Sequence, residues 1–338
     1  MDTRPLIGIT MGDPAGIGPE IIVAGLADPT IHESCRPLVL GDAGILSTAL
    51  LDYCNRTGRG LTLNVIRKPG EARGNPGAID LIAVSELGDS AIQPGRPTVA
   101  GGRAMVAAIF RAAEMALRAD IAAMVTCPIS KALMHKAGYA FEGHTQMIAH
   151  LTNTPDVVMM LAGERLRVTL VTIHCAIRDV PDLLTVDRVL KTIRITEEAL
   201  RRDFNLPRPR LAVAALNPHG GEGGLFGDEE ARIIAPAVDK ARKQGMRAEG
   251  PFPADTLFHG AASGAYDAVV AMYHDQGLIP LKLLHFSDAV NITLGLPIIR
   301  TSVDHGTAYD IAGTGKADPS SLKAAISMAA GMAANRRN

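Results

Sequence analysis

Residues 6–10 read Leu6-Ile7-Gly8-Ile9-Thr10, and after Met11 the chain continues as Gly12-Asp13-Pro14-Ala15-Gly16-Ile17-Gly18-Pro19-Glu20. The first five residues are mostly apolar and β-branched, as in a buried strand. A turn rich in Gly and Pro follows, and Pro19 suits the first turn of a helix, where a missing N–H is tolerated. Strand, loop and helix therefore succeed one another directly, which is typical of an α/β fold.

The same alternation continues along the chain. Between Gly102 and Leu117 the apolar side chains fall on one helical face, which predicts a packed surface helix. Further buried strands are expected at Ile121–Val125, Val168–Ile173, Leu211–Leu216 and Ala268–Met272. Gly70–Ser90 opens with a stretch rich in Gly, Pro and Asn and is expected to be a surface connection. The predicted fold class is α/β, with a mostly parallel sheet covered by helices.

The composition indicates a full-sized globular protein of 338 residues, enough for about two domains. The 34 Lys and Arg residues balance 35 Asp and Glu residues, so neither nucleic acid nor a membrane surface is an expected partner. Four dispersed cysteines indicate reduced thiols. The first apolar run is too short for a signal-peptide core, and no stretch reaches the ~20 apolar residues of a membrane helix. The expected location is the cytoplasm.

The glycine-rich turn has two interpretations. Backbone N–H groups and the dipole at a helix N-terminus favour an anion, so the turn is compatible with a ligand loop. A purely structural turn explains it equally well. It is not a Rossmann fingerprint, because Gly16-Ile17-Gly18 would require Gly or Ala at position 21, where the chain has Ile21.

Three histidines follow predicted strands: His174, His219 and His274. Ligands of open α/β sheets gather at the carboxyl ends of the strands, and neutral imidazoles are common ligands of divalent metals. Each histidine alone is more simply a hydrogen-bonded loop residue. The three together favour a metal site that polarises a substrate hydroxyl or carbonyl group.

A second group suits an anionic substrate and comprises His144, Thr145, Lys282, Asn291 and Arg300. Arginine binds carboxylate or phosphate through a planar fork, and lysine supplies a point charge. Lys282 and Arg300 are equally compatible with solvated surface charges. The segment Asp304–Asp318 is dense in Gly and small polar residues and is either a close-approach loop for a ligand or a plain connection to a helix.

Together these segments resemble the 4-hydroxythreonine-4-phosphate dehydrogenase family, whose members include relatives acting on four-carbon sugar acid phosphates such as D-threonate 4-phosphate. The likeness covers nearly the whole chain. Its most specific segments are Gly12–Glu20, Gly143–Thr145, Leu216–Glu222, Pro253–Thr256, Tyr273–Gly277, Asn291–Pro297 and Asp304–Asp318.

The resemblance implies an isocitrate/isopropylmalate-dehydrogenase-like fold of two α/β/α domains with the site in the cleft. Residues 1–126 with 300–338 are then expected to form the domain with the cofactor loops, and residues 127–299 the domain with the metal site and dimer interface. NAD or NADP is held without a Rossmann motif in such folds. The implied cofactor contacts are Gly16, Gly18, His305, Gly306 and Thr307.

The resemblance also implies the other site residues. His174, His219 and His274 would bind a divalent metal ion, with zinc, cobalt, manganese, nickel and magnesium as candidates. The substrate contacts implied are His144, Thr145, Lys282, Asn291 and Arg300. Family members are homodimers with a shared active site, in which the neighbouring chain supplies the residue matching His274.

The expected function is metal-dependent oxidation by NAD(P), followed by decarboxylation, of a four-carbon phosphorylated hydroxy acid. Biosynthetic members usually have glycine where this chain has His285, which favours D-threonate 4-phosphate or D-erythronate 4-phosphate as substrate. The alternative is 4-phosphohydroxy-L-threonine, in pyridoxal phosphate biosynthesis.

Asp255 and Asp275 are the candidate catalytic residues for proton handling, and orienting roles for both remain as alternatives. A metal-dependent lyase would use the same residues without a nicotinamide cofactor. A phosphometabolite-binding protein would bind the ligand without chemistry.

Overall fold

The computed structural model describes residues 2–88 and 92–337. The chain divides into two compact units, Met1–Pro155 with Leu296–Asn338, and Asp156–Gly295. The sequence had suggested boundaries after residues 126 and 299. Residues 127–155 belong instead to the first unit, because helices α5 (Lys131–Lys136) and α6 (His144–Leu151) pack against its helix α4 (Val99–Leu117).

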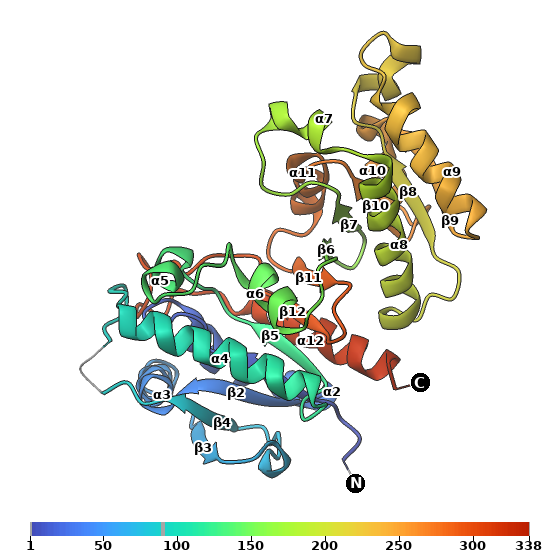
Figure 1. Cartoon of the computed structure of the whole chain (residues 1–338). Coiled ribbons are helices and arrows are strands. Elements are labelled where there is room, and N and C mark those ends of the chain that lie inside the picture. The colour runs from blue at the N-terminus through green and yellow to red at the C-terminus, as the bar shows by residue number, and fades with distance from the viewer. Residues whose placement is uncertain (1, 89–91, 338) are drawn as a thin grey trace. The chain divides into compact units, whose positions relative to one another are not determined.

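The first unit contains a parallel sheet with the strand order β3-β4-β2-β1-β5-β12 (Figure 1). Its strands are β1 (Leu6–Thr10), β2 (Arg36–Asp42), β3 (Thr62–Ile66), β4 (Ala78–Ser85), β5 (Ala123–Thr126) and β12 (Arg300–Ser302). Its other helices are α1 (Gly18–Leu26), α2 (Pro29–Ser34), α3 (Ala43–Thr57), the short η1 (Pro69–Glu71) and α12 (Ser320–Asn335).

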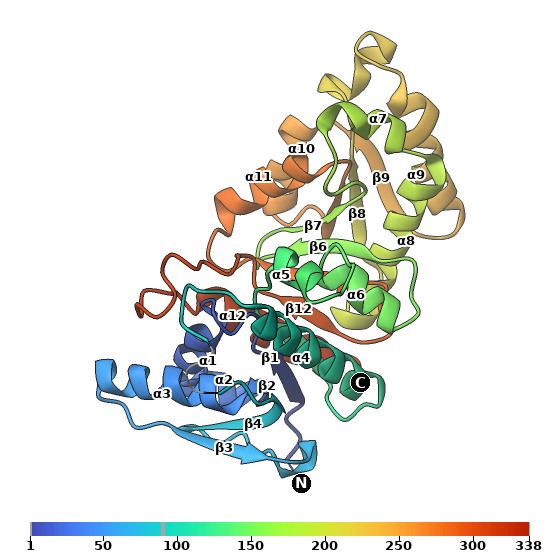
Figure 2. The same cartoon turned by 60° about the vertical axis from the view of Figure 1, so that its left-hand side comes forward.

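Helices cover both faces of this sheet. The chain moves from β1 to β2 in one direction and from β4 back to β5 in the other, so right-handed crossovers place α1 and α4 on opposite faces. Figure 2 shows α4 on one side of β1 and β2 and the group α1 to α3 on the other. Ile7 and Ile9 are consequently fully buried.

The expectation that Gly70–Ser90 is a surface connection is wrong for its second half. Residues Ala78–Ser85 form β4, which lies between β2 and β3. Its Asp80 is buried and accepts hydrogen bonds from the backbone N–H groups of Arg73 (2.8 Å) and Gly74 (2.9 Å). The Gly/Pro cluster marked the turn correctly, but the short apolar run after it is a strand.

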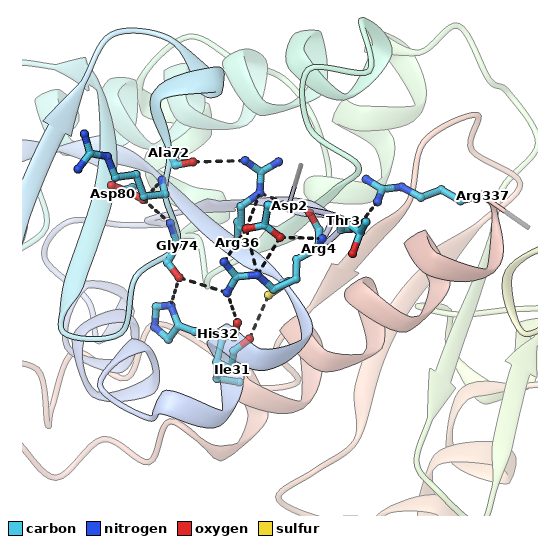
Figure 3. A network of polar contacts seen from close by, with 12 residues as sticks. Asp2, Thr3, Arg4, Ile31, His32, Arg36, Ala72, Gly74, Asp80 and Arg337 are labelled. Carbon is cyan, nitrogen blue, oxygen red and sulfur yellow. Dashed lines mark hydrogen bonds and ion pairs between the residues drawn. The ribbon is translucent and has the colours of Figure 1, made fainter.

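The same turn is fastened to the N-terminal region (Figure 3). The carbonyl oxygen of Gly74 accepts from Arg4 Nη1 (3.4 Å) and lies 3.2 Å from His32 Nδ1. Arg4 also donates to the carbonyl oxygen of His32. These contacts hold the amino end of the sheet, on the edge opposite the carboxyl ends of its strands.

The second unit has the strand order β11-β6-β7-β10-β8-β9, in which β7, β10, β8 and β9 are parallel. Its strands are β6 (Val158–Ala162), β7 (Arg167–Leu170), β8 (Arg210–Ala214), β9 (Arg247–Phe252), β10 (Ala268–Ala271) and β11 (Val290–Leu294). Its helical segments are η2 (Ile177–Asp179), α7 (Val180–Leu183), α8 (Val186–Asp203), η3 (Pro218–Gly224), η4 (Glu230–Ile234), α9 (Ala235–Lys243), α10 (Ala254–Ala262) and α11 (His274–Leu284).

Successive side chains of β7 point to opposite faces of this sheet, and helices cover both faces. Val168 and Leu170 join the core formed with α10 and α11, whereas the hydroxyl of Thr169 between them accepts from Thr196 of α8 at 3.1 Å. Figure 2 shows α10 and α11 on one side of the strands and α8 and α9 on the other. Each unit is therefore a helix–sheet–helix sandwich, which confirms the α/β class.

The predicted elements are confirmed within a few residues. The four predicted strands are β5, β7, β8 and β10, and the predicted helix is α4. This helix begins earlier than expected, at Val99, because the Thr98 hydroxyl caps it by accepting from Gly101 N at 3.1 Å.

Candidate active site

In the first unit, Arg300 and His144 come together at the carboxyl end of β5. Arg300 is buried at the start of β12 and donates from Nη2 to the hydroxyl of Thr126, the last residue of β5, at 2.7 Å. His144 begins α6, and its buried Nε2 atom has no hydrogen-bond partner within the described residues. Thr145 follows it, half-buried in the first turn.

The charges of this cluster favour an anionic ligand. Burial lowers the pKa of His144 well below 6.5, and the positive charges of Arg300 and Lys131 lower it further. Burial also lowers the pKa of Arg300, to about 9, so its guanidinium remains charged at neutral pH. A neutral imidazole beside a buried cation fits a phosphate or carboxylate group that both can bind.

Two members of this cluster were missed from the sequence. Lys131 begins α5, and its Cε would lie 3.5 Å from a Cβ placed on Gly143, beside His144. Thr126 is the hydroxyl partner of Arg300. Their position in the sequence could have identified both residues, because they lie at or just after the end of the predicted strand Ile121–Val125.

The second unit brings two of the three candidate metal ligands together. His174, His219 and His274 follow β7, β8 and β10, which are parallel neighbours, so their loops emerge at one edge of the sheet. The rings of His174 and His274 have centroids 5.9 Å apart, and both line a cavity of about 300 Å³ with Cys175 and Tyr273. The sheet thus produces the convergence that the sequence suggested for this pair.

His219 does not join them. Within the part of the chain that the structure describes, no three His, Cys, Asp or Glu side chains form a group that could hold a metal ion. His219 is exposed on η3, where residues 219–223 all have positive φ angles. Among the described residues, His174 and His274 therefore form a pair of suitable ligand type for a divalent metal, and His219 lies outside that pair.

Asp275 has an orienting contact. Its Oδ1 lies 2.8 Å from Nδ1 of His274, which leaves Nε2 of that ring for a ligand. Asp255 is exposed in the first turn of α10, a helix that contacts η3. The second-unit substrate candidates are both half-buried, Lys282 in the last turn of α11 and Asn291 in β11.

Glu230 supports the turn that carries His219, a role that the sequence did not reveal. Its buried carboxylate accepts from the backbone N–H groups of Leu216 (2.8 Å) and Asn217 (2.7 Å) and from Asn217 Nδ2 (2.9 Å). Three donors on one carboxylate fix the end of β8 and the start of the turn.

The two candidate cofactor segments lie against each other. Ile17 N donates to the carbonyl oxygen of Thr307 at 3.0 Å. His305 and Thr307 are half-buried and Gly306 is exposed, and the buried Nε2 of His305 has no partner within residues 2–88 and 92–337. A ring nitrogen of this kind fits a polar ligand such as an adenine base, and so agrees with a dinucleotide loop.

Gly16 and Gly18, by contrast, pack against the protein itself. Both are buried, and a Cβ would lie 2.9 Å from the Thr307 carbonyl oxygen at Gly16 and 2.1 Å from that of Met11 at Gly18. The missing side chains of Gly16 and Gly18 are therefore required by close packing within the chain, and their contact with the cofactor stays a prediction. Their role is to let the first loop approach the His305–Thr307 segment.

The family described as "Pyridoxal phosphate biosynthetic protein PdxA" matches residues 33–329. The chain belongs to the PdxA family. This confirms the resemblance inferred from the sequence.

Relatives of this PdxA-family chain are similar over their full length. The 4-hydroxythreonine-4-phosphate dehydrogenase of Geobacter metallireducens is 58% identical over 334 residues, 98% of this chain and 96% of that protein. The D-threonate 4-phosphate dehydrogenase of Salmonella typhimurium is 46% identical over 329 residues, 97% of this chain and 99% of that protein. The crystal structure of 4-hydroxythreonine-4-phosphate dehydrogenase from Klebsiella pneumoniae is 46% identical, covers 98% of both chains and has a TM-score of 0.91.

Among the described residues, no helix of this PdxA-family chain combines the length and apolar character that crossing a membrane requires.

Proposed function

We propose that this PdxA-family chain is a dehydrogenase that oxidises a CH–OH group of a phosphorylated four-carbon hydroxy compound and then releases carbon dioxide. The observation that carries this proposal is the buried Arg300 beside neutral His144, because a phosphate or carboxylate group satisfies both. Lys282 and Asn291 are proposed as further substrate-binding residues.

Each of these groups is proposed to have a separate role in binding or proton transfer. The segment His305–Thr307 would hold a nicotinamide dinucleotide, which would supply the hydride acceptor, and the candidate histidines would hold a divalent metal ion, which would polarise the substrate hydroxyl. Arg300, His144 and Lys131 hold the anionic end of the substrate. Asp275 orients His274 through the 2.8 Å contact with Nδ1. Asp255 is proposed to accept the hydroxyl proton.

Three substrates remain candidates: 4-phosphohydroxy-L-threonine, D-threonate 4-phosphate and D-erythronate 4-phosphate. Relatives named for 4-hydroxythreonine 4-phosphate reach 58% identity, and those named for D-threonate 4-phosphate reach 46%, which favours the first. Both ring nitrogens of His285 serve the fold, so this residue favours D-threonate 4-phosphate or D-erythronate 4-phosphate only through its difference from the glycine usual in biosynthetic members. Nε2 accepts from Arg165 N at 3.2 Å, and Nδ1 lies 2.9 Å from Asp288 Oδ2.

A homodimer with shared sites is proposed to complete the metal site. Its support is the incomplete histidine set of one chain and the apolar side chains exposed on and beside α11. Ile279 is 59% exposed, Leu283 82% and Phe286 83%. Neighbouring apolar side chains with this exposure are typical of a surface that another chain covers.

The activity is tested by absorbance of reduced nicotinamide when NAD or NADP and a divalent metal are mixed with each candidate substrate. Candidates are 4-phosphohydroxy-L-threonine, D-threonate 4-phosphate and D-erythronate 4-phosphate. Reduction that a chelator abolishes supports the proposal and ranks the substrates. Turnover without dinucleotide would indicate a lyase, and binding without turnover would indicate a phosphometabolite-binding protein.

The shared site is tested by mixing two inactive variants, His274→Ala and His174→Ala. If each site uses His274 of the neighbouring chain, a mixed dimer has one intact site, and about a quarter of wild-type activity should return. If both histidines of a site come from one chain, every site in the mixture lacks one of them, and no activity returns.

A further inference from the structure

Tyr309 lies among three loops at the carboxyl ends of β1, β5 and β12. Its hydroxyl donates to Asp13 Oδ2 at 2.6 Å, across 296 positions of sequence. Ser130, in the loop after β5, and Thr307 lie close enough to the phenol for their hydroxyls to lower its pKa. The hydrogen bond from Tyr309 to Asp13 thus joins the loop after β12 to the loop after β1.

Asp13 is built into the first loop by a second contact. Its Oδ1 accepts from Ala15 N at 2.9 Å, so both carboxylate oxygens are used. The side chain is 1% exposed, and among residues 2–88 and 92–337 no cation pairs with it. Burial raises its pKa accordingly. Burying a carboxylate without a neighbouring cation lowers the free energy of unfolding, which points to a role of Asp13 beyond packing.

The Tyr309 hydroxyl keeps its proton and therefore remains a hydrogen-bond donor. Burial and the bond to Asp13 raise the pKa of Tyr309 to about 12, so its proton stays on the oxygen at any physiological pH. The hydrogen bond therefore persists, and its carboxylate acceptor makes it one of the stronger kind.

Further contacts fasten the rest of the segment. Glu20, at the start of α1, accepts from the backbone N–H groups of Gly313 (3.1 Å) and Gly315 (3.0 Å). Gly95 N donates to the Ala15 carbonyl oxygen at 2.8 Å. The loop from residue 305 to residue 315 is therefore held near its middle by Asp13, through Tyr309, and at its carboxyl end by Glu20.

We propose that Tyr309 and Asp13 are positioning residues for the dinucleotide, which hold the His305–Thr307 segment in its binding geometry without touching the ligand. The inference rests on the proposed function, because it assumes that this segment binds a nicotinamide dinucleotide. It assigns the two residues no part in hydride or proton transfer.

The test is equilibrium binding of NADH and NADPH, followed by the fluorescence anisotropy of the reduced nicotinamide, in the full chain without substrate. Tyr309→Phe should weaken binding of the preferred dinucleotide by up to roughly 10- to 150-fold, the value of one hydrogen bond to a charged group. Hydrogen exchange should be faster for the amides of residues 305–315. The KM for the phosphorylated substrate should change much less than the KM for the dinucleotide.

Tyr266→Phe is the matched control, because Tyr266 also donates to a carboxylate, Glu249, at 3.2 Å, but in the second unit. It should bind the dinucleotide as the wild type does. Asp13→Asn is the second variant, because Ala15 N and Tyr309 donate to different carboxylate oxygens of Asp13 and asparagine keeps only one of these two acceptors. Both substitutions break the same hydrogen bond, between Tyr309 and Asp13. The double variant should therefore lose no more dinucleotide affinity than the more affected single variant.

Three experimental results would each contradict a different part of the proposal. Wild-type affinity and unchanged hydrogen exchange in Tyr309→Phe overturn the positioning role. Additive losses in the double variant overturn the pairing of the two residues. A wild-type chain that binds neither dinucleotide overturns the proposed function and this inference with it.

Discussion

Arg300 donates to the Thr126 hydroxyl at 2.7 Å, so the first residue of β12 is joined to the last residue of β5. The contact orients a buried guanidinium, and His144 lies close enough for its pKa to respond to that charge. The candidate substrate-binding cluster therefore depends on two strands that are adjacent in space and distant in sequence.

Arg300→Lys should raise the KM for the phosphorylated substrate roughly 10- to 150-fold, because lysine keeps the charge but loses the planar fork, at about 1.5–3 kcal/mol. Steady-state kinetics at saturating dinucleotide measure this. Arg118→Lys is the control, since the Arg118 side chain is 64% exposed and pairs with Glu114 on the surface of α4. An unchanged KM in Arg300→Lys would remove Arg300 from the substrate site.

His144 should make stability depend on pH. Its folded pKa is lowered, so it stabilises the folded state above the unfolded value of about 6.5, and this contribution is lost as pH falls below that value. The free energy of unfolding should decline by at most about 1.4 kcal/mol per pH unit for this one group.

The measurement is urea unfolding between pH 7.5 and pH 5 for the wild type and His144→Gln. The variant should show the shallower decline, because glutamine does not titrate. Parallel declines in the two proteins would show that His144 has an ordinary pKa in the folded chain.

Glu230→Gln should lower the free energy of unfolding by about 1.5–3 kcal/mol, because the amide nitrogen of glutamine would face Asn217 Nδ2, another donor. Asp228→Asn is the control. Its exposed pair with Arg232 is worth about 0.5 kcal/mol or less. Urea unfolding followed by circular dichroism compares the two, and equal effects would argue against a special role of Glu230 in the turn.

Gly163→Ala should destabilise the chain by about 1–3 kcal/mol, because a Cβ there would lie 2.2 Å from the His285 ring. Adding His285→Ala removes the ring, so the double variant should be close in stability to His285→Ala alone. Urea unfolding of the three variants measures this cycle. Strict additivity would mean that the two residues do not share this space.

The sequence determined the elements of the fold where apolar periodicity was clear. The strands after which His174, His219 and His274 follow were predicted because a buried strand has a local signature. β4 was missed because a cluster of turn residues preceded its short apolar run. The sequence indicated a glycine-rich turn that contains Gly16 and Gly18. Only the structure shows that Thr307 and Met11 fill the space that these glycines leave.

Tertiary structure alone decided which of these residues meet. The strand order placed β5 beside β12 and brought Arg300 to Thr126, and loop packing brought Tyr309 to Asp13. It also left His219 outside the pair formed by His174 and His274. The physical reason is that helix and strand propensities are set by neighbours in sequence, whereas pairing of distant strands depends on how the whole chain buries its apolar surface.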